Sequence, residues 1–203
     1  MRPVPRTDRR PRTRQDPAVR RAEILAVATV LFGVRPYPDV AVTAIAERVG
    51  VSEALVLRYF GTKGELYTAV VEAALARLQA EHEAADAALP AGTPPMSRVA
   101  RSIEVYLDVV AAAPVGWSAP LRGEGVPAAD RLRAQALTGY VDRLADVLSV
   151  DPAGPAGLAL RGYLGFLESA CLAWADRGCP ASSRPALLAM SLDALQAALE
   201  AAL

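Results

Sequence analysis

The residues best suited to bind another molecule lie between Ser52 and Lys63, where a hydroxyl, an acid and two cations follow one another closely. Arg58 could donate hydrogen bonds either to a guanine edge or to phosphate oxygens, and the sequence does not choose between them. Lys63 is a compact cation suited to phosphate. A helix could hold these side chains along one face, so the surrounding elements decide the interpretation.

Two short helices joined by a tight turn are predicted in this stretch. Apolar residues recur at helical spacing on both sides of the turn, and they are Val42, Ile45, Ala46 and Val49 before it and Val56, Tyr59 and Phe60 after it. Gly50 stands where a left-handed backbone is cheap, and Ser52 is a good N-cap for a helix beginning near Glu53. The pattern predicts a helix-turn-helix, although an ordinary helical hairpin in an all-α core gives the same spacing.

Two longer stretches carry a more specific signal. They are RRAEILAVATVLF, from Arg20 to Phe32, and IAERVGVSEALVLRYFGTKGELY, from Ile45 to Tyr67. Together they resemble the N-terminal domain of the tetracycline-repressor (TetR) family of transcriptional regulators. The resemblance implies a helix-turn-helix DNA-binding domain over residues 20–67, with helix four beginning near residue 63, and a ligand-binding and dimerisation domain over residues 68–203.

The resemblance also implies which side chains meet DNA, with residues 52–58 as the recognition helix. These DNA-binding residues are Thr43, Ser52, Glu53, Ala54, Leu57, Arg58, Tyr59 and Lys63. Leu57 stands where the family usually has Tyr, so we expect an apolar contact, such as a thymine methyl, in place of a hydrogen bond. Tyr59 and Lys63 resemble backbone clamps, and core packing is the alternative for Tyr59 and for Leu57.

Upstream of this helix the sequence departs from the family pattern at two points. Pro36 stands before Tyr37 where the family usually has Gly, and Ala41 stands where a hydroxyl usually opens helix two. A phosphate contact and a cap are therefore missing. Asp39 could cap a helix that starts one or two residues earlier, but an acid there would repel phosphate.

Charge is unevenly distributed along the 203 residues, although the formal net charge is zero. Residues 1–67 carry eleven Arg and Lys63 against seven acids, a balance of +5. Residues 68–203 carry ten basic and fifteen acidic residues, a balance of −5. This polarity suits a protein that meets phosphates with one end only.

Residues 1–19 mix Arg and Pro with almost nothing apolar to bury, so they are predicted to form a disordered arm. Its arginines are either simply solvated or add phosphate or minor-groove contacts. The arm lacks the apolar region of a secretory signal. The longest uncharged run, from Val109 to Leu121, is broken by Pro114 and Pro120, so we expect a cytoplasmic protein with no membrane span.

The rest of the chain predicts helices only. Thr62 and Glu65 form a capping box for a long helix that ends near Ala88. Proline and glycine breaks separate further helices, predicted at about 97–112, 127–149, 155–177 and 183–202, with an irregular stretch at 114–127. The fold class is therefore all-α, a three-helix DNA-binding domain followed by a helical bundle.

The last two helices are rich in small and apolar residues. Small side chains that permit close helix approach recur in the first of them, at Gly157, Gly162, Gly165, Ser169 and Ala173. Internal packing could bury these faces. The resemblance instead implies a homodimer through the last two helices, which would read a palindromic double-stranded DNA operator.

A small-molecule effector is implied by the resemblance, and it would bind in the C-terminal bundle. Candidate lining residues are aromatic side chains and one cation: Tyr106, Trp117, Arg122, Tyr140, Tyr163, Phe166 and Trp174. Trp117 beside Arg122 would suit an apolar anionic ligand.

Enzymatic and metal chemistry have little support. Cys171 and Cys179 are too few for a zinc site or a disulfide framework, and the single histidine, His82, lies among charges and is predicted to be solvated. We therefore expect no enzyme activity, no metal and no cofactor. The function predicted is a ligand-released DNA-binding repressor, and the alternative is an all-α protein-binding adaptor with a vestigial helix-turn-helix.

Overall fold

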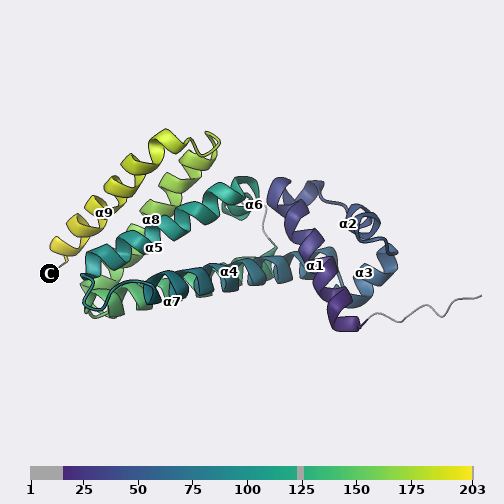
Figure 1. The fold of residues 1–203 in the computed structure, drawn as a ribbon, viewed down its shortest axis with the longest axis horizontal. Coiled ribbons are helices and arrows are strands. Elements are labelled where there is room, and N and C mark those ends of the chain that lie inside the picture. The colour runs from purple at the N-terminus through teal and green to yellow at the C-terminus, as the bar shows by residue number, and fades with distance from the viewer. Residues whose placement is uncertain (1–15, 123–125, 203) are drawn as a thin grey trace, which may run out of the picture.

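A computed structural model describes residues 16–122 and 126–202 of the chain. Within these residues the regular structure is entirely helical, so the all-α prediction is confirmed. At one end of the molecule lie α1 (Pro17–Val34), η1 (Tyr37–Asp39), α2 (Val42–Val49) and α3 (Glu53–Phe60) (Figure 1). The long α4 (Lys63–Ala87) leads from them into a bundle of α5 (Pro95–Ala112), α6 (Pro114–Ser118), η2 (Ala119–Arg122), α7 (Pro127–Leu148), α8 (Pro155–Ala175), η3 (Ala181–Ser183) and α9 (Arg184–Glu200).

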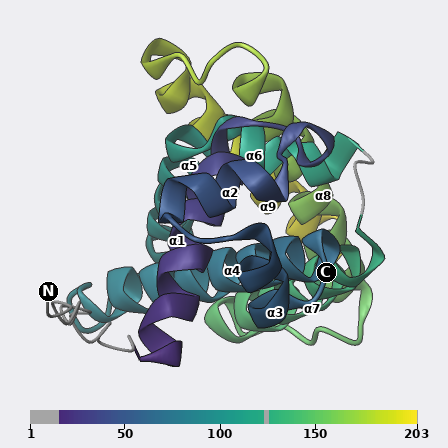
Figure 2. The ribbon, with the colours of Figure 1, turned by 90° about the vertical axis from the view of Figure 1, so that its right-hand side faces the viewer.

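The three N-terminal helices and the start of α4 share one apolar core. Its most buried members include Ile24, Ile45, Val56 and Leu66, which come from α1, α2, α3 and α4 in turn. Figure 2 looks onto this end of the molecule, with α1, α2 and α3 in front of the bundle. Because α4 contributes its first two turns to this core, a movement of α4 would also shift the helices of the helix-turn-helix.

Helix α1 begins at Pro17, three residues before the start suggested by the sequence resemblance. Asp16 is its N-cap, and the Asp16 carboxylate accepts a hydrogen bond of 2.8 Å from the Ala18 amide. Proline is favoured at the first helical position because its missing N–H has no helical partner there. Residues 17–19 of the predicted arm are thus helical, and residues 1–15 lie outside the described part of the chain.

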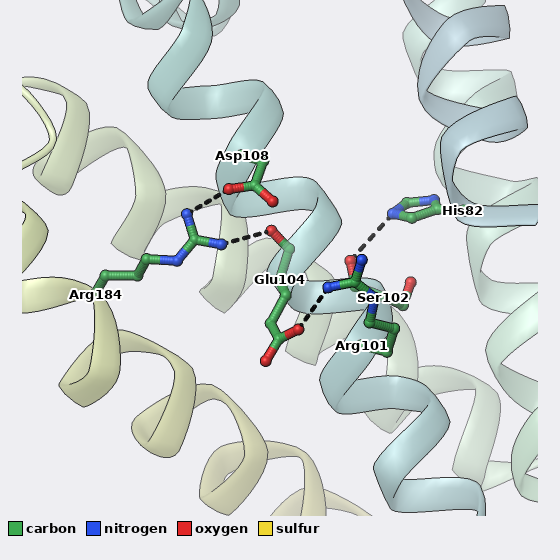
Figure 3. Close-up of polar contacts among 6 residues, drawn as sticks. All are labelled: His82, Arg101, Ser102, Glu104, Asp108 and Arg184. Carbon is green, nitrogen blue, oxygen red and sulfur yellow. Dashed lines mark hydrogen bonds and ion pairs between the residues drawn. The ribbon is translucent and has the colours of Figure 1, made fainter. Parts of the chain in front are cut away.

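The second core lies in the bundle, where α5, α7, α8 and α9 meet. Leu107, Leu160, Cys171 and Leu195 are fully buried there. The capping box predicted for α4 is present, with Glu65 N–H donating to Thr62 Oγ1 at 3.1 Å and Thr62 N–H donating to Glu65 Oε2 at 2.8 Å. An arginine at the start of α9 ties it to α5: Arg184 donates to Asp108 Oδ1 at 2.6 Å and to the Glu104 carbonyl at 3.0 Å (Figure 3).

The stretch predicted to be irregular contains two short helices, α6 and η2, and that part of the prediction was wrong. Proline and glycine usually break helices, but Pro114 lies in the first turn of α6, where proline is favoured. A Cβ on Gly116 would lie 2.7 Å from Gly33 Cα, so α6 rests directly on the backbone of α1. No helix among the described residues is long and apolar enough to cross a membrane.

Candidate nucleic-acid interface and ligand cavity

The turn between α2 and α3 has the geometry that the sequence predicts. Gly50 adopts a left-handed backbone with φ of 76°, and its amide donates to the carbonyls of the last turn of α2. Ser52 caps α3, with its Oγ accepting from the Leu55 amide at 3.3 Å. The opposite end of α2 has no such cap: Ala41 is its N-cap residue without a side-chain hydrogen bond, and Asp39 lies in η1.

One face of α3 is directed away from the core. Ser52, Glu53, Ala54 and Arg58 are exposed, and Leu57 is partly buried without joining the N-terminal core. Positions three and four apart share a helix face, so Ala54, Leu57 and Arg58 form one outward stripe, opposite the buried Val56 and Phe60. Thr43 is exposed on α2.

Tyr59 differs from the other predicted contacts. It is partly buried and packs against the N-terminal core, as do Val49 and Val51 of the helix-turn-helix. This placement favours the alternative of core packing for Tyr59, and it favours surface contact for Leu57.

Lys63 is held at the first turn of α4 by two groups from η1. Its ammonium donates to the Pro38 carbonyl at 3.2 Å and lies 4.3 Å from the centroid of the Tyr37 ring. Partial desolvation lowers the Lys63 pKa from its ordinary value, and the nearby Asp39 opposes that shift. Helix N-termini favour anions, so a cation fixed at this point is well placed for a DNA phosphate.

The described part of the N-terminal domain has no excess of positive charge. Residues 16–67 contain six basic and six acidic residues, and the balance of +5 over residues 1–67 therefore comes entirely from residues 1–15. Those fifteen residues hold six arginines and one aspartate.

A cavity of about 280 Å³ lies between α1, α4, α5, α6, α7 and α8, with mainly apolar walls. Tyr106, Trp117, Tyr140 and Tyr163 line it. Its wall also includes Thr29, Phe32 and Gly33 of α1 and Tyr67 of α4, so it reaches the helices that carry the helix-turn-helix.

The other three candidate lining residues are placed differently. Phe166 lies on the outer surface of α8 and is 37% exposed. Trp174 is in the bundle core, where its Nε1 donates to the Pro180 carbonyl at 3.1 Å. Arg122 ends η2, and its side chain lies outside the described part of the structure.

Several polar residues of the cavity wall were not anticipated from the sequence. The prediction of a solvated His82 was wrong: its side chain is buried, because this face of α4 packs on α5 and α7. Arg133 and Arg143 also line the cavity and are paired with acids, Arg133 with Glu168 at 3.5 Å and Arg143 with Glu83 at 3.6 Å.

A helix-turn-helix is thus joined by the long α4 to a helical bundle with an apolar cavity. Residues 24–70 match the family model of bacterial regulatory proteins, tetR family, which confirms the resemblance predicted from the sequence. No curated protein sequence matches the chain.

Solved structures share the fold across nearly the whole chain. A tetR-family transcriptional regulator from Streptomyces coelicolor is 24% identical, with a TM-score of 0.76 over 90% of this chain and 80% of that one. A TetR-like regulator from Rhodococcus sp. RHA1 is 20% identical, with a TM-score of 0.67 over 92% and 99%. The fatty acid degradation regulator FadR from Bacillus halodurans is 18% identical, with a TM-score of 0.68 over 91% and 96%. These structures show the fold, and the family match over residues 24–70 supports a DNA-binding transcriptional regulator.

Proposed function

We propose that this protein is a repressor that binds a palindromic operator as a homodimer and is released by a small molecule bound in the cavity. The observation that carries the proposal is the shared wall: Phe32 and Tyr67 belong to the core of the N-terminal domain and also line the cavity. In this proposal residues 17–67 read DNA, and residues 68–203 provide most of the effector cavity and the contacts to the second subunit.

A chain of aromatic rings connects the cavity to the proposed phosphate clamp. The centroid of the Tyr37 ring lies 6.0 Å from that of Phe32 and 4.9 Å from that of Tyr67. The Lys63 ammonium lies 4.3 Å from the centroid of the same Tyr37 ring. A ligand that displaces Phe32 or Tyr67 would therefore shift the groups that hold Lys63. Through α4 and α6 the same ligand would change the orientation of α1, since α6 lies against its backbone.

The outer faces of α8 and α9 support dimerisation. Leu158, Phe166 and Met190 are 76%, 37% and 46% exposed, and these apolar side chains lie on the last two helices. A Cβ added at Gly162 or Gly165 would meet nothing within 4 Å, so packing within one subunit does not require glycine there. Close approach of a second subunit does account for glycine at these positions.

Lys63→Ala should weaken operator binding by a similar factor on every DNA sequence and lower the salt slope by about one per subunit. The reason is that a phosphate contact carries no sequence information. Fluorescence anisotropy titrations on operator and scrambled DNA over a salt series measure both quantities. A change in sequence preference with an unchanged salt slope would contradict the clamp role.

Leu57→Ala should cost operator affinity at one A·T pair per half-site, by roughly 1–3 kcal/mol, and should leave the melting temperature unchanged. The reason is that Leu57 lies outside the core and offers only van der Waals contact to a thymine methyl. Titrations on operators with thymine or uracil at each position locate the methyl. Val56→Ala, at a fully buried position on the same helix, is the control and should lower the melting temperature. A lower melting temperature of Leu57→Ala with unaltered thymine dependence would show that Leu57 packs in the core and does not contact DNA.

Selection of genomic DNA fragments with the purified protein tests the proposed function. We expect a small set of fragments that share a palindrome, with two half-sites about 34–36 Å or a multiple apart. Absence of any enriched fragment would favour the alternative of a protein-binding adaptor with a vestigial helix-turn-helix. Adding metabolite extracts to the bound fragments then tests release.

A further inference from the structure

The cavity wall contains a histidine whose protonation pattern is set by one hydrogen bond. His82 Nε2 lies 3.2 Å from the Ser102 carbonyl oxygen (Figure 3). A carbonyl oxygen only accepts, so Nε2 carries the hydrogen. In the neutral ring Nδ1 is then an acceptor, and this atom is buried with no hydrogen-bond partner among the described residues.

The surroundings of His82 favour the neutral ring. Burial lowers its pKa below the ordinary 6.5, the hydrogen bond to Ser102 opposes that shift, Arg143 lowers the pKa further, and Glu81 raises it. The His82 and Tyr140 rings also pack in a T-shaped arrangement, with centroids 5.8 Å apart. At neutral pH the ring therefore carries an unused hydrogen-bond acceptor at Nδ1 and no charge, and His82 is part of the cavity wall.

A second buried polar atom in the same wall lacks a partner. The Tyr163 hydroxyl has none among the described residues, and Tyr163 is 4% exposed. Burial raises its pKa well above the ordinary value, so the phenol stays protonated and can donate or accept. Buried polar groups without partners are costly, and two of them beside one apolar cavity indicate groups that a ligand would satisfy.

The charged groups of the wall do not compete for this role. Arg133 and Arg143 already pair with Glu168 and Glu83, so a ligand anion would have to displace or share those carboxylates. A carboxylate would also bring no donor to Nδ1 of His82, and it would lose its hydration among apolar side chains.

We propose that the effector is an uncharged apolar molecule with a hydroxyl or N–H group that donates to His82 Nδ1, a second polar contact being available at the Tyr163 hydroxyl. This choice of ligand class rests on the proposed function, because it assigns the cavity to an effector.

Three probes with one ring system test this ligand class on the full-length protein. Naphthol carries a neutral donor, methoxynaphthalene has only an acceptor, and naphthoate is an anion at neutral pH. Isothermal titration calorimetry should show naphthol binding roughly 3- to 10-fold more tightly than methoxynaphthalene, the range of one hydrogen bond, with naphthoate weakest. Naphthoate binding most tightly, equal affinities for naphthol and methoxynaphthalene, or no binding of any probe would overturn the proposal.

Two variants locate the contact. His82→Phe keeps a ring of similar shape without the acceptor, and it should abolish the preference for naphthol over methoxynaphthalene. Tyr163→Phe is the milder variant, and it should weaken the binding of both probes while the protein stays folded, because the Tyr163 hydroxyl can donate to the oxygen of either one. Tyr140→Phe removes another cavity hydroxyl and serves as the control with an unchanged preference. A preference for naphthol that survives in His82→Phe would contradict the assignment.

The two proposals fail in different ways. Release of operator by an anionic ligand that outcompetes naphthol would leave the repressor function standing and reject the ligand class. Binding of the probes in the predicted order, with no ligand affecting DNA binding, would support the ligand class and reject release of the repressor by a ligand.

Discussion

Removal of residues 2–15 should weaken operator binding at least about tenfold at physiological salt and flatten its dependence on salt concentration. The reason is the distribution of charge: residues 16–67 contain equal numbers of basic and acidic residues, and the six arginines of residues 1–15 supply the whole positive balance. The dependence of affinity on salt concentration reports the number of phosphates that the protein neutralises, so this dependence should decrease when the arginines are removed. Electrophoretic mobility shifts over a salt series measure both effects.

A second variant distinguishes phosphate contacts, which depend on charge, from minor-groove contacts, which depend on the arginine side chain. Replacing the same six arginines with lysine preserves the charge and should keep most of the affinity if the contacts are to phosphate. Reading of a narrow minor groove depends on arginine, and in that case the lysine form would lose A·T preference. A truncated protein with the affinity and salt slope of the full chain would show that the arginines are only solvated.

Gly165→Glu should convert the dimer into monomers that keep their helical content and bind the operator roughly 100-fold or more weakly. The position has open space in one subunit, so the new side chain is tolerated there. In a dimer built on α8 and α9 the carboxylate would be buried without a partner, and a monomer reads one half-site. Sedimentation velocity and operator titration give the two readouts.

Gly139→Glu is the matched control for this change. Gly139 is also a helical glycine whose added Cβ would meet nothing within 4 Å, but it lies on α7. It carries the same change in charge and helix propensity and should remain dimeric with full operator affinity. If the Gly165→Glu variant remained dimeric, the dimer interface would not lie at this position of α8.

The local signals of the helix-turn-helix were sufficient to predict it from sequence. Gly50, Ser52 and the pair of Thr62 and Glu65 act through bonds to their own neighbours, so their roles do not depend on distant packing. Helix α1 starts three residues before the stretch that carries the family resemblance, because Asp16 caps it and Pro17 suits its first position.

The cavity could be predicted only in part, because lining depends on which helix faces meet. Four of the seven candidate residues, Tyr106, Trp117, Tyr140 and Tyr163, line it. Trp174 looks equivalent in sequence but packs in the bundle core. His82 has charged neighbours along the chain, and only the packing of α5 and α7 against α4 buries it.

Release of a selected genomic fragment, compared between the natural protein and Ala136→Trp, tests most directly the claim that a ligand in the cavity controls DNA binding. Ala136 lines the cavity on α7, so a tryptophan there would fill the space while leaving the distant α2 and α3 unchanged. Anisotropy of the labelled fragment is followed while a metabolite extract is added. We expect the extract to release the natural protein and not the filled variant from the fragment. Equal release of both proteins, or an extract that never releases the natural one, would contradict it.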